Sequence, residues 1–144
     1  MKVQSILAAK GTKVMTTRPG ATIGTVIRKM RLDKVGALVV SDDGERVLGL
    51  VSERDIVHGL AEHGAELLAL KVADLMTRGG PTCTREDSIR KVMADMTQRR
   101  VRHLPVVEGG RLGGIISIGD VVKNRLEEME LETNVLRDAY LATR

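Results

Sequence analysis

The chain has 144 residues, a formal net charge of +4, 42% hydrophobic and 29% charged residues, and Tyr140 as its only aromatic side chain. This length is enough for one compact domain or for two very small domains with a shared core, and the composition is that of an ordinary globular protein. Because aromatic rings are almost absent, recognition of nucleic acid by stacking bases on rings is excluded. The lone cysteine, Cys83, excludes an internal disulfide and a cysteine-based metal site.

The positive charge has no dense focus. Basic residues are spread along the chain, apart from a cluster at Arg99, Arg100 and Arg102. A polynucleotide partner would show a dense basic stripe, so this distribution argues against nucleic-acid binding. Residues 1–7 contain no long apolar run, which predicts neither a secretory signal nor a membrane span. A cytoplasmic location is therefore expected.

The first half of the chain predicts an edge strand, a helix, two strands and a second helix. Thr22 stands where a helix N-cap belongs, and apolar residues follow it at helical spacing. Short β-branched runs separated by a Gly-containing turn predict the strands, and Gly64 is the expected C′ residue of the last helix. The expected strands and turn are, in chain order, 14–17, 37–40, 41–44 (turn) and 47–51.

The second half repeats this order. Ser88 takes the place of Thr22 before another helix with the same apolar spacing, and strand-like runs follow. The predicted alignment sets Ala37–Val40 beside Leu104–Val107. The corresponding pieces are an edge strand at 82–84, strands at 104–107 and 112–116, and a turn at 108–110. The sequence thus predicts an α/β (α+β) fold of two repeats, each a small β-sheet with flanking helices, related by a pseudo-twofold axis. The predicted boundaries are 1–64, 65–124 and a helical tail at 125–144.

One motif occurs once in each repeat. Residues 49–55 and 114–120 both read Gly-apolar-apolar-Ser-x-x-Asp, which predicts a strand that runs into a helix N-terminus. Ser52 and Ser117, with free backbone N–H groups behind them, suit a phosphate oxygen. Asp55 and Asp120 can each accept hydrogen bonds from the vicinal hydroxyls of a ribose. The alternative is that Ser-x-x-Asp is only a capping box that stabilises the helix start.

The two motifs, their spacing, the Ser52–Asp55 junction and the run Arg102–Val107 resemble the CBS-domain pair, or Bateman module, over nearly the whole chain. The resemblance is to small stand-alone bacterial members. It implies clefts that bind adenosine-containing nucleotides, with Ser52, Asp55, Ser117 and Asp120 at phosphate and ribose. The module would act in signal transduction, sensing energy or redox state without catalysis.

The basic residues make the two expected sites unequal. By resemblance, Arg102 and His103 hold phosphate, and the matching stretch of the first repeat carries no charge at these places. Arg54 lies inside the first motif and can hold a phosphate bidentately, where the second motif has Gly119. Arg99 and Arg100 are interpreted as a solvated helix end.

Adenine recognition has a weaker signal. Without aromatic rings, the base would lie between aliphatic side chains and form hydrogen bonds with the backbone. The resemblance points to Val101, Met76, Thr77 and Lys10 as residues that line the adenine. AMP is the first candidate ligand, followed by ATP, ADP and NAD(H), and no metal site is expected.

The C-terminal residues predict a long helix with an apolar stripe, which would run past the module. Its residues are Val122, Leu126, Met129, Thr133, Leu136 and Tyr140. We expect this face to pack on a partner in a homodimer, and the alternative is docking onto the same chain. The protein regulated by such a sensor is not indicated. The alternative function is a dimerising interaction scaffold with vestigial clefts.

Overall fold

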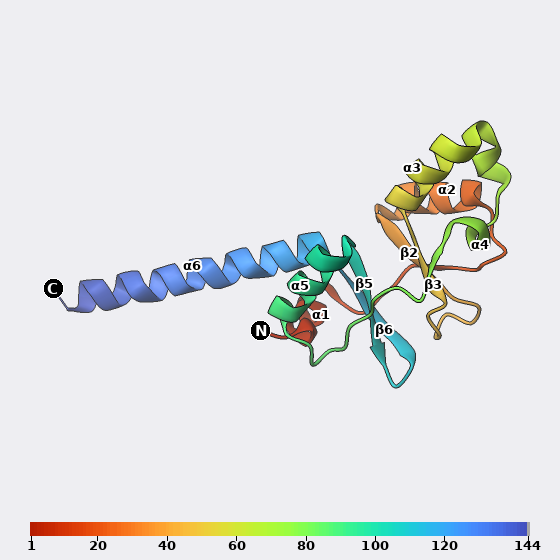
Figure 1. Ribbon diagram of the computed structural model, residues 1–144. Coiled ribbons are helices and arrows are strands. Elements are labelled where there is room, and N and C mark those ends of the chain that lie inside the picture. Colours follow the sequence, from red (N-terminus) through yellow and green to blue (C-terminus); the bar gives the residue numbers. More distant parts are fainter. Residues whose placement is uncertain (144) are drawn as a thin grey trace.

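The computed structural model describes residues 1–143 and consists of two α/β halves and a long projecting helix (Figure 1). The first half holds β1 (Thr16–Thr17), α2 (Ile23–Asp33), β2 (Ala37–Val40), β3 (Gly49–Ser52) and α3 (Glu53–His63). The second half holds α5 (Ile89–Arg99), β5 (His103–Glu108), β6 (Arg111–Ser117) and α6 (Ile118–Ala142). Four further elements are α1 (Val3–Lys10), the 3-10 helix Gly64–Ala69, α4 (Val72–Leu75) and β4 (Thr77–Arg78).

The strands form two sheets. One has the order β1-β2-β3-β4, in which β1 runs parallel to β2 and the other pairs are antiparallel. The other is the β5-β6 hairpin, to which Cys83 adds an isolated parallel bridge at Val106. The predicted edge strands at 14–17 and 82–84 therefore each pair, in part, with the middle strand of their repeat, which is β2 in the first half and β5 in the second. The predicted α/β class, with small sheets and flanking helices in each repeat, is confirmed.

The helix starts follow from local chemistry. Thr22 and Ser88 accept hydrogen bonds from the backbone N–H three residues later, as predicted for N-caps. Gly64 ends α3 with φ 62° and donates its N–H to the carbonyl of Leu60, so the predicted C′ glycine is also confirmed. Lys34 and Arg100 end α2 and α5, and both have φ 55°, a left-handed conformation that side chains with a Cβ rarely adopt.

Each repeat completes its core with a segment from the start of the other repeat. Helix α1 buries Val3, Ile6 and Leu7 in the core of the second half. Leu67 and Val72, from the stretch between the repeats, lie in the core of the first half. The structure thus has two hydrophobic cores instead of one shared core. The predicted boundaries at 64 and 124 stay predictions about the sequence repeats. Residues that follow 64 pack in the core of the first half, and helix α6 continues without a break past 124.

Matching backbone hydrogen bonds tie these exchanged segments in place. The N–H of Val3 donates to the carbonyl of Asp87, and the N–H of Val72 donates to the carbonyl of Ala21. Because Ala21 and Asp87 both immediately precede an N-cap residue, Val3 and Val72 are equivalent positions of the two repeats. This equivalence supports the pseudo-twofold relation.

The strand pairing corrects the predicted alignment by one residue. Ala37 pairs with Ser52, and His103 pairs with Ser117, so Ala37 is the counterpart of His103. The sequence alignment had set Ala37 beside Leu104 because both begin an apolar run. The backbone register shows that His103 already belongs to the strand.

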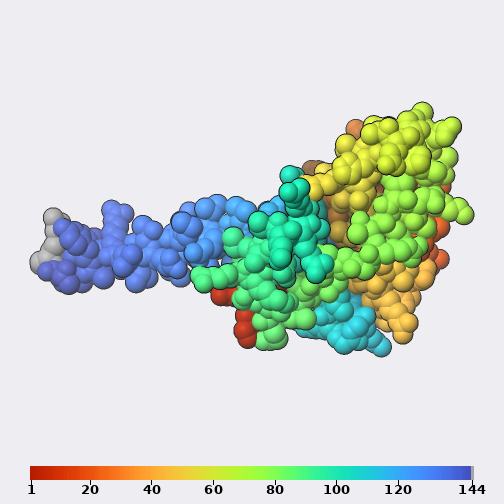
Figure 2. Space-filling view, in the orientation of Figure 1, coloured from red at the N-terminus to blue at the C-terminus, as the bar shows by residue number. Residues whose placement is uncertain are grey.

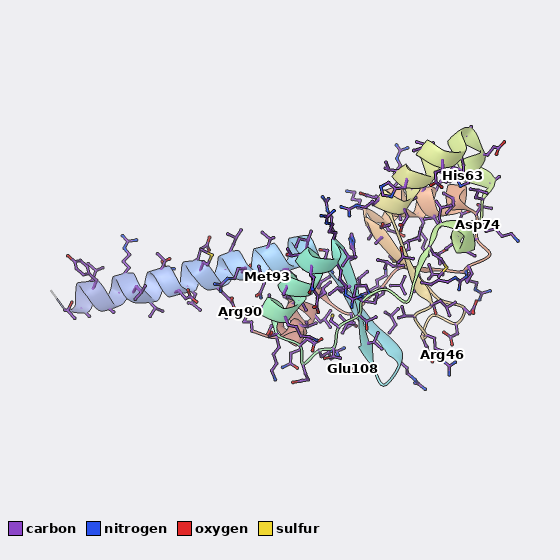
Figure 3. The ribbon with its side chains drawn as sticks, in the orientation of Figure 1. Arg46, His63, Asp74, Arg90, Met93 and Glu108 are labelled. Carbon is purple, nitrogen blue, oxygen red and sulfur yellow. The ribbon has the colours of Figure 1, made fainter. Side chains whose placement is uncertain are left out.

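The last helix, α6, is attached to the second half only at its beginning. Val121 and Asn124 are buried there, whereas residues 129–142 of α6 are exposed and project from the body (Figures 1 and 2). Side chains along this projecting part point outward around the helix (Figure 3). Among residues 1–143, no helix is both long enough and apolar enough to cross a membrane.

Candidate functional site

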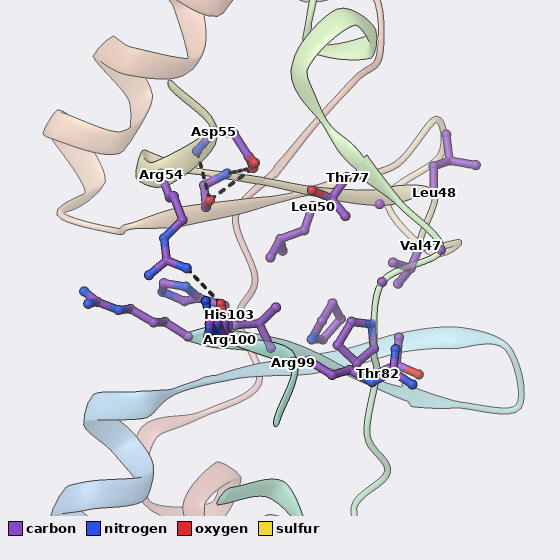
Figure 4. A pocket seen from close by; sticks show the side chains of 18 of the residues that line it. Val47, Leu48, Leu50, Arg54, Asp55, Thr77, Thr82, Arg99, Arg100 and His103 are labelled. Atoms are coloured by element: carbon purple, nitrogen blue, oxygen red, sulfur yellow. Dashed lines mark hydrogen bonds between the residues drawn. The ribbon is translucent and has the colours of Figure 1, made fainter. Parts of the chain in front are cut away.

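A pocket of about 670 Å³ lies between the two halves of the molecule (Figure 4). Strand β3 and the start of α3 form one wall, and the end of α5 with β5 forms the other. The segment Gly79–Thr82, which links the halves, closes one side. A volume of this size falls within the range of roughly 300–1,000 Å³ that is typical of small-molecule sites.

Ser52 and Asp55 line this pocket at the start of α3, where they form a capping box. Oδ2 of Asp55 accepts hydrogen bonds from the Ser52 N–H at 2.8 Å and from the Ser52 hydroxyl at 3.0 Å. The N–H of Asp55 donates to the Ser52 hydroxyl at 3.4 Å. The Ser-x-x-Asp sequence therefore does form a capping box. Among residues 1–143, Oδ1 of Asp55 accepts no hydrogen bond, so this oxygen can serve a ligand.

Four arginines line the same pocket. Arg54 reaches across from α3 and donates from Nη1 to the carbonyl of Arg100 at 2.9 Å, which joins the two walls (Figure 4). Arg99, Arg100 and Arg102 come from the opposite wall. Arg99 and Arg100 are exposed, as expected for a helix end, but they are also part of the pocket. Together with Arg54 and Arg102 they give the lining of the cavity a positive charge.

His103 also lines the pocket, where it is partly buried. Burial lowers the pKa of His103, and the positive charges of Lys10 and Arg102 add to this effect, whereas Glu53 and Asp120 oppose it. The imidazole is therefore neutral at pH 7 and can donate one hydrogen bond and accept another. A bound phosphate would favour its protonated form.

The remaining surface of the pocket is largely aliphatic. Leu50 and Val47 from the first half line it, as do Val101 and Val107 from the second half. Backbone groups of Gly79 and Gly80 lie at the edge. A flat apolar group can fit between such walls without an aromatic partner.

The second motif forms the same capping box but has a different neighbour. The Ser117 N–H donates to Oδ2 of Asp120 at 2.9 Å, and Nζ of Lys10 donates to the same oxygen at 2.7 Å. Nζ of Lys10 also donates to the carbonyl of Ile115 at 3.0 Å. Burial raises the pKa of Asp120, but the hydrogen bond and charge of Lys10, with the bonds from Ser117, outweigh burial and lower it overall.

The glycine that begins each motif lies against another segment of the chain. A Cβ on Gly49 would collide with the carbonyl oxygen of Thr77 and lie 2.6 Å from Cε of Met76. A Cβ on Gly114 would lie 2.8 Å from Cδ2 of Leu7. These glycines therefore make room for the exchanged segments that complete each core.

A family model for the CBS domain matches residues 9–62 and 72–127, which together make up most of the chain. The chain belongs to the CBS-domain family. A CBS-domain containing protein from Agrobacterium tumefaciens, ATU1752, has a crystal structure that superposes with a TM-score of 0.84 at 42% identity, covering 87% of this chain and 99% of that one. Among curated proteins, the mitochondrial CBS domain-containing protein CBSX3 of Arabidopsis thaliana is 35% identical over 83% of this chain, which spans only 60% of that relative's length.

A more distant structure shows the same fold. The CBS domain pair of protein MJ0100, described in complex with 5′-methylthioadenosine and S-adenosyl-L-methionine, superposes with a TM-score of 0.79 at 19% identity, covering 89% of this chain and 98% of that one. Those ligands belong to the MJ0100 pair. The likeness itself supports the tandem arrangement of the two repeats.

The fold brings most of the predicted site residues together around the first motif. The predicted residues that line the pocket at Asp55 are Ser52, Arg54, Asp55, Thr77, Val101, Arg102 and His103. Ser117 and Asp120 lie at the second motif, where Lys10 contacts Asp120 instead of lining the pocket. Met76 is buried in the core of the first half, because it fills the space above Gly49. The roles of all these residues stay predictions.

Sequence reasoning missed the apolar lining and the linker. Leu50 could have been found, because residues of β3 alternate between buried and partly exposed positions and Leu50 shares a face with Ser52. Nothing in the sequence around Gly79–Thr82 distinguishes a pocket wall from a plain loop. Within residues 1–143, no group of three or more His, Cys, Asp or Glu side chains is placed to hold a metal ion.

Proposed function

We propose that this CBS pair is a regulatory module that binds an adenine nucleotide in the pocket at Asp55. The observation that carries the proposal is the combination of groups in this pocket. A carboxylate with a free oxygen lines it together with four arginines and several aliphatic side chains. These three kinds of group suit the ribose, phosphate and base of a nucleotide.

Each part of a nucleotide has a chemically suited partner. Asp55 would accept hydrogen bonds from the two ribose hydroxyls, and charge-assisted bonds of this kind are among the stronger ones. Arg54, Arg102 and neutral His103 would contact the phosphate, with the α3 N-terminus adding a favourable dipole. The base would lie between Leu50 and Val101. No nucleophile or catalytic pair is part of this arrangement, so we propose binding without catalysis.

AMP is the first candidate, because one phosphate suffices for the arginines that converge near Asp55. ATP, ADP and NAD(H) remain candidates, since Arg99 and Arg100 extend the positive surface beyond the first phosphate position. The adenosine compounds bound by the MJ0100 pair also justify testing nucleosides without phosphate. A cytoplasmic sensor of energy or redox state would meet all of these ligands.

Isothermal titration with AMP, ADP, ATP and NADH tests the proposal directly. We expect saturable binding to the wild-type protein and a raised melting temperature. Absence of both heat and a melting shift with every one of these ligands would overturn it. Mass spectrometry of small molecules released from the purified protein provides an independent test that assumes no ligand.

A dimerising scaffold with a vestigial pocket is the alternative function. The two can be distinguished through Asp55→Asn, which can preserve the capping box while removing the charge. A scaffold keeps its partner binding unchanged by this substitution and by added nucleotide. A sensor changes its affinity for the partner with nucleotide, provided that the ligand binds two conformations unequally.

We also propose that the projecting part of α6 pairs with a second copy of the chain. Residues 129–142 carry no buried side chain, and an isolated helix of this length is only marginally stable in water. The apolar stripe follows alternating spacings of four and three residues, which is the heptad spacing of a coiled coil. The exposed members of this stripe include Val122, Leu126, Met129 and Leu136.

The charges beside the stripe favour a parallel arrangement. With Leu126 at position a, Arg125 and Glu132 take g positions, while Glu130 and Arg137 take e positions. In a parallel pair each g residue faces the following e residue of the other copy, which sets Arg125 opposite Glu130 and Glu132 opposite Arg137.

Light scattering after size exclusion tests this pairing. We expect a dimer for the wild-type protein and a monomer for Leu136→Glu, whereas Leu131→Glu, at another exposed position off the stripe, remains a dimer. A monomeric wild-type protein would overturn the pairing without affecting the nucleotide proposal.

A further inference from the structure

The two exchanged helices differ in length, although they occupy equivalent places. Helix α1 has 8 residues, and α4 has 4. Val3 and Val72 are equivalent because their N–H groups bond to equivalent carbonyls. Helix α1 therefore continues for one more turn, which ends in Lys10. At the equivalent place in the first half, the chain after α4 leaves the helix and forms β4, which pairs with β3.

This extra turn brings an ammonium group to the second motif. Nζ of Lys10 contacts Oδ2 of Asp120 and the carbonyl of Ile115, which uses two of its three donors. The corresponding carboxylate of the first motif, Asp55, has no cationic partner among residues 1–143, and its pocket is open. The hydroxyls of a ribose would need the same carboxylate that Lys10 already holds.

The second motif has fewer of the cations that surround the first, although Lys34 at the end of α2 is the counterpart of Arg100. Gly119 takes the place of Arg54 inside the motif, and the strand register makes Gly36 the counterpart of Arg102. Asp33, the last residue of α2, corresponds to Arg99, the last residue of α5. A phosphate at the second motif would meet an acidic residue where the pocket offers a guanidinium group.

We propose that Lys10 is a built-in occupant of the second motif, which keeps nucleotide away from Asp120 and limits each chain to one nucleotide, bound in the pocket at Asp55. This inference rests on the proposed nucleotide binding. Lys10 is thereby a specificity-determining residue: it replaces a ligand at one of two similar motifs. Removal of its side chain would free the carboxylate for a ribose but would leave fewer cations for a phosphate than the pocket at Asp55 has, so the opened site would favour an uncharged nucleoside.

Titration with AMP and with adenosine tests the proposal on wild-type protein, Lys10→Ala and the matched control Lys13→Ala. We expect one AMP per chain for all three proteins. We expect one adenosine per chain for wild type and Lys13→Ala and a second, weaker adenosine for Lys10→Ala. Lys10→Ala places a strong helix former at an exposed helix end, and an unchanged circular dichroism spectrum checks its fold.

Two results would overturn the proposal. One is a stoichiometry of two AMP molecules per chain in the wild-type protein, and the other is a folded Lys10→Ala that still takes only one adenosine. The failure of nucleotide binding itself has a different signature, because the wild-type protein would then bind nothing. If Lys10→Ala nevertheless gained an adenosine site, Lys10 would still be shown to occupy the second motif, while nucleotide binding at Asp55 failed.

A readout without any nucleotide checks the contact on which the proposal depends. The carboxyl resonance of Asp120 can be titrated by NMR in wild-type protein and in Lys10→Gln. Because Lys10 favours the charged carboxylate, we expect the titration midpoint of Asp120 to rise in Lys10→Gln. An unchanged midpoint would show that Lys10 does not hold Asp120 in solution and would overturn the proposal.

Discussion

The two copies of the Ser-x-x-Asp motif have the same local structure and different surroundings. Ser52 with Asp55 and Ser117 with Asp120 both form a capping box at the end of a strand. Asp55 faces a pocket with four arginines, whereas Asp120 is held by Lys10. The comparison shows that the motif secures a helix start in both repeats, and that only its neighbours can make it a ligand site.

These neighbours come from the other repeat in each case. Arg102 and His103 of the second half reach the first motif, and Lys10, from the start of the first repeat, reaches the second motif. Duplication therefore preserved the internal geometry of each repeat, while differences in the contributed residues made the two motifs unequal.

The largest expected effect separates the two aspartates. Asp55→Asn should weaken AMP binding about 10- to 100-fold, because a hydrogen bond to a charged group contributes roughly 1.5–3 kcal/mol. Asp120→Asn should leave AMP affinity unchanged within the error of the measurement. Isothermal titration of both variants is the test, and equal losses would remove the distinction between the motifs.

The arginines allow a second comparison, between ligands with and without phosphate. Arg102→Ala should weaken AMP binding about tenfold, since one charge-assisted contact is lost, and should leave adenosine binding unchanged. Raising the salt concentration should weaken AMP binding to the wild-type protein more than to the variant. A parallel loss for both ligands would instead indicate that Arg102 supports the shape of the pocket.

A smaller effect is expected from the protonation of His103. Burial keeps the pKa of His103 below its usual value, and bound phosphate should raise it, so AMP binding takes up a proton. AMP affinity should therefore rise as the pH falls from 8 to 6. Titrations in buffers of different ionisation enthalpy measure the uptake, and His103→Gln distinguishes it from protonation of the phosphate itself. Equal uptake by the variant would contradict this role for His103.

The smallest effect concerns stability at the second motif. The pair of Lys10 and Asp120 is partly exposed to solvent, so Lys10→Ala should lower the free energy of unfolding by only about 0.5 kcal/mol at pH 7. The folded state lowers the pKa of Asp120, so this contribution is present above the unfolded pKa of about 3.9 and is lost as the pH falls through the folded value. Urea unfolding at pH 7 and pH 2.5 should show a smaller difference at the lower pH.

Much of the local structure could be predicted from the chain alone. The caps at Thr22 and Ser88, the strand at 37–40 and the end of α3 at Gly64 depend on hydrogen bonds and apolar spacing within a few residues. Such short-range preferences are visible in a sequence. The register of His103 was misjudged by one residue, because a polar side chain at a strand end does not reveal that its backbone is already paired.

The site was harder, because its members lie far apart along the chain. Met76 and Lys10 were both expected to line adenine, yet Met76 fills the space above Gly49 and Lys10 reaches Asp120. Arg100 was set aside as a helix end, although its carbonyl receives Arg54 across the pocket. No local pattern records these contacts, since each depends on which segment crosses to the other repeat.

The amino-acid sequence by itself determined two repeats, their strands and helices, and a capped helix start at each motif, because these follow from periodicity and from hydrogen bonds between near neighbours. Tertiary structure alone decided that one motif opens into a charged pocket while the other holds a lysine. The reason is physical: an extra turn of α1 and the crossing of Arg54 to the opposite wall set the distances between charges, and those distances arise only when the two halves pack.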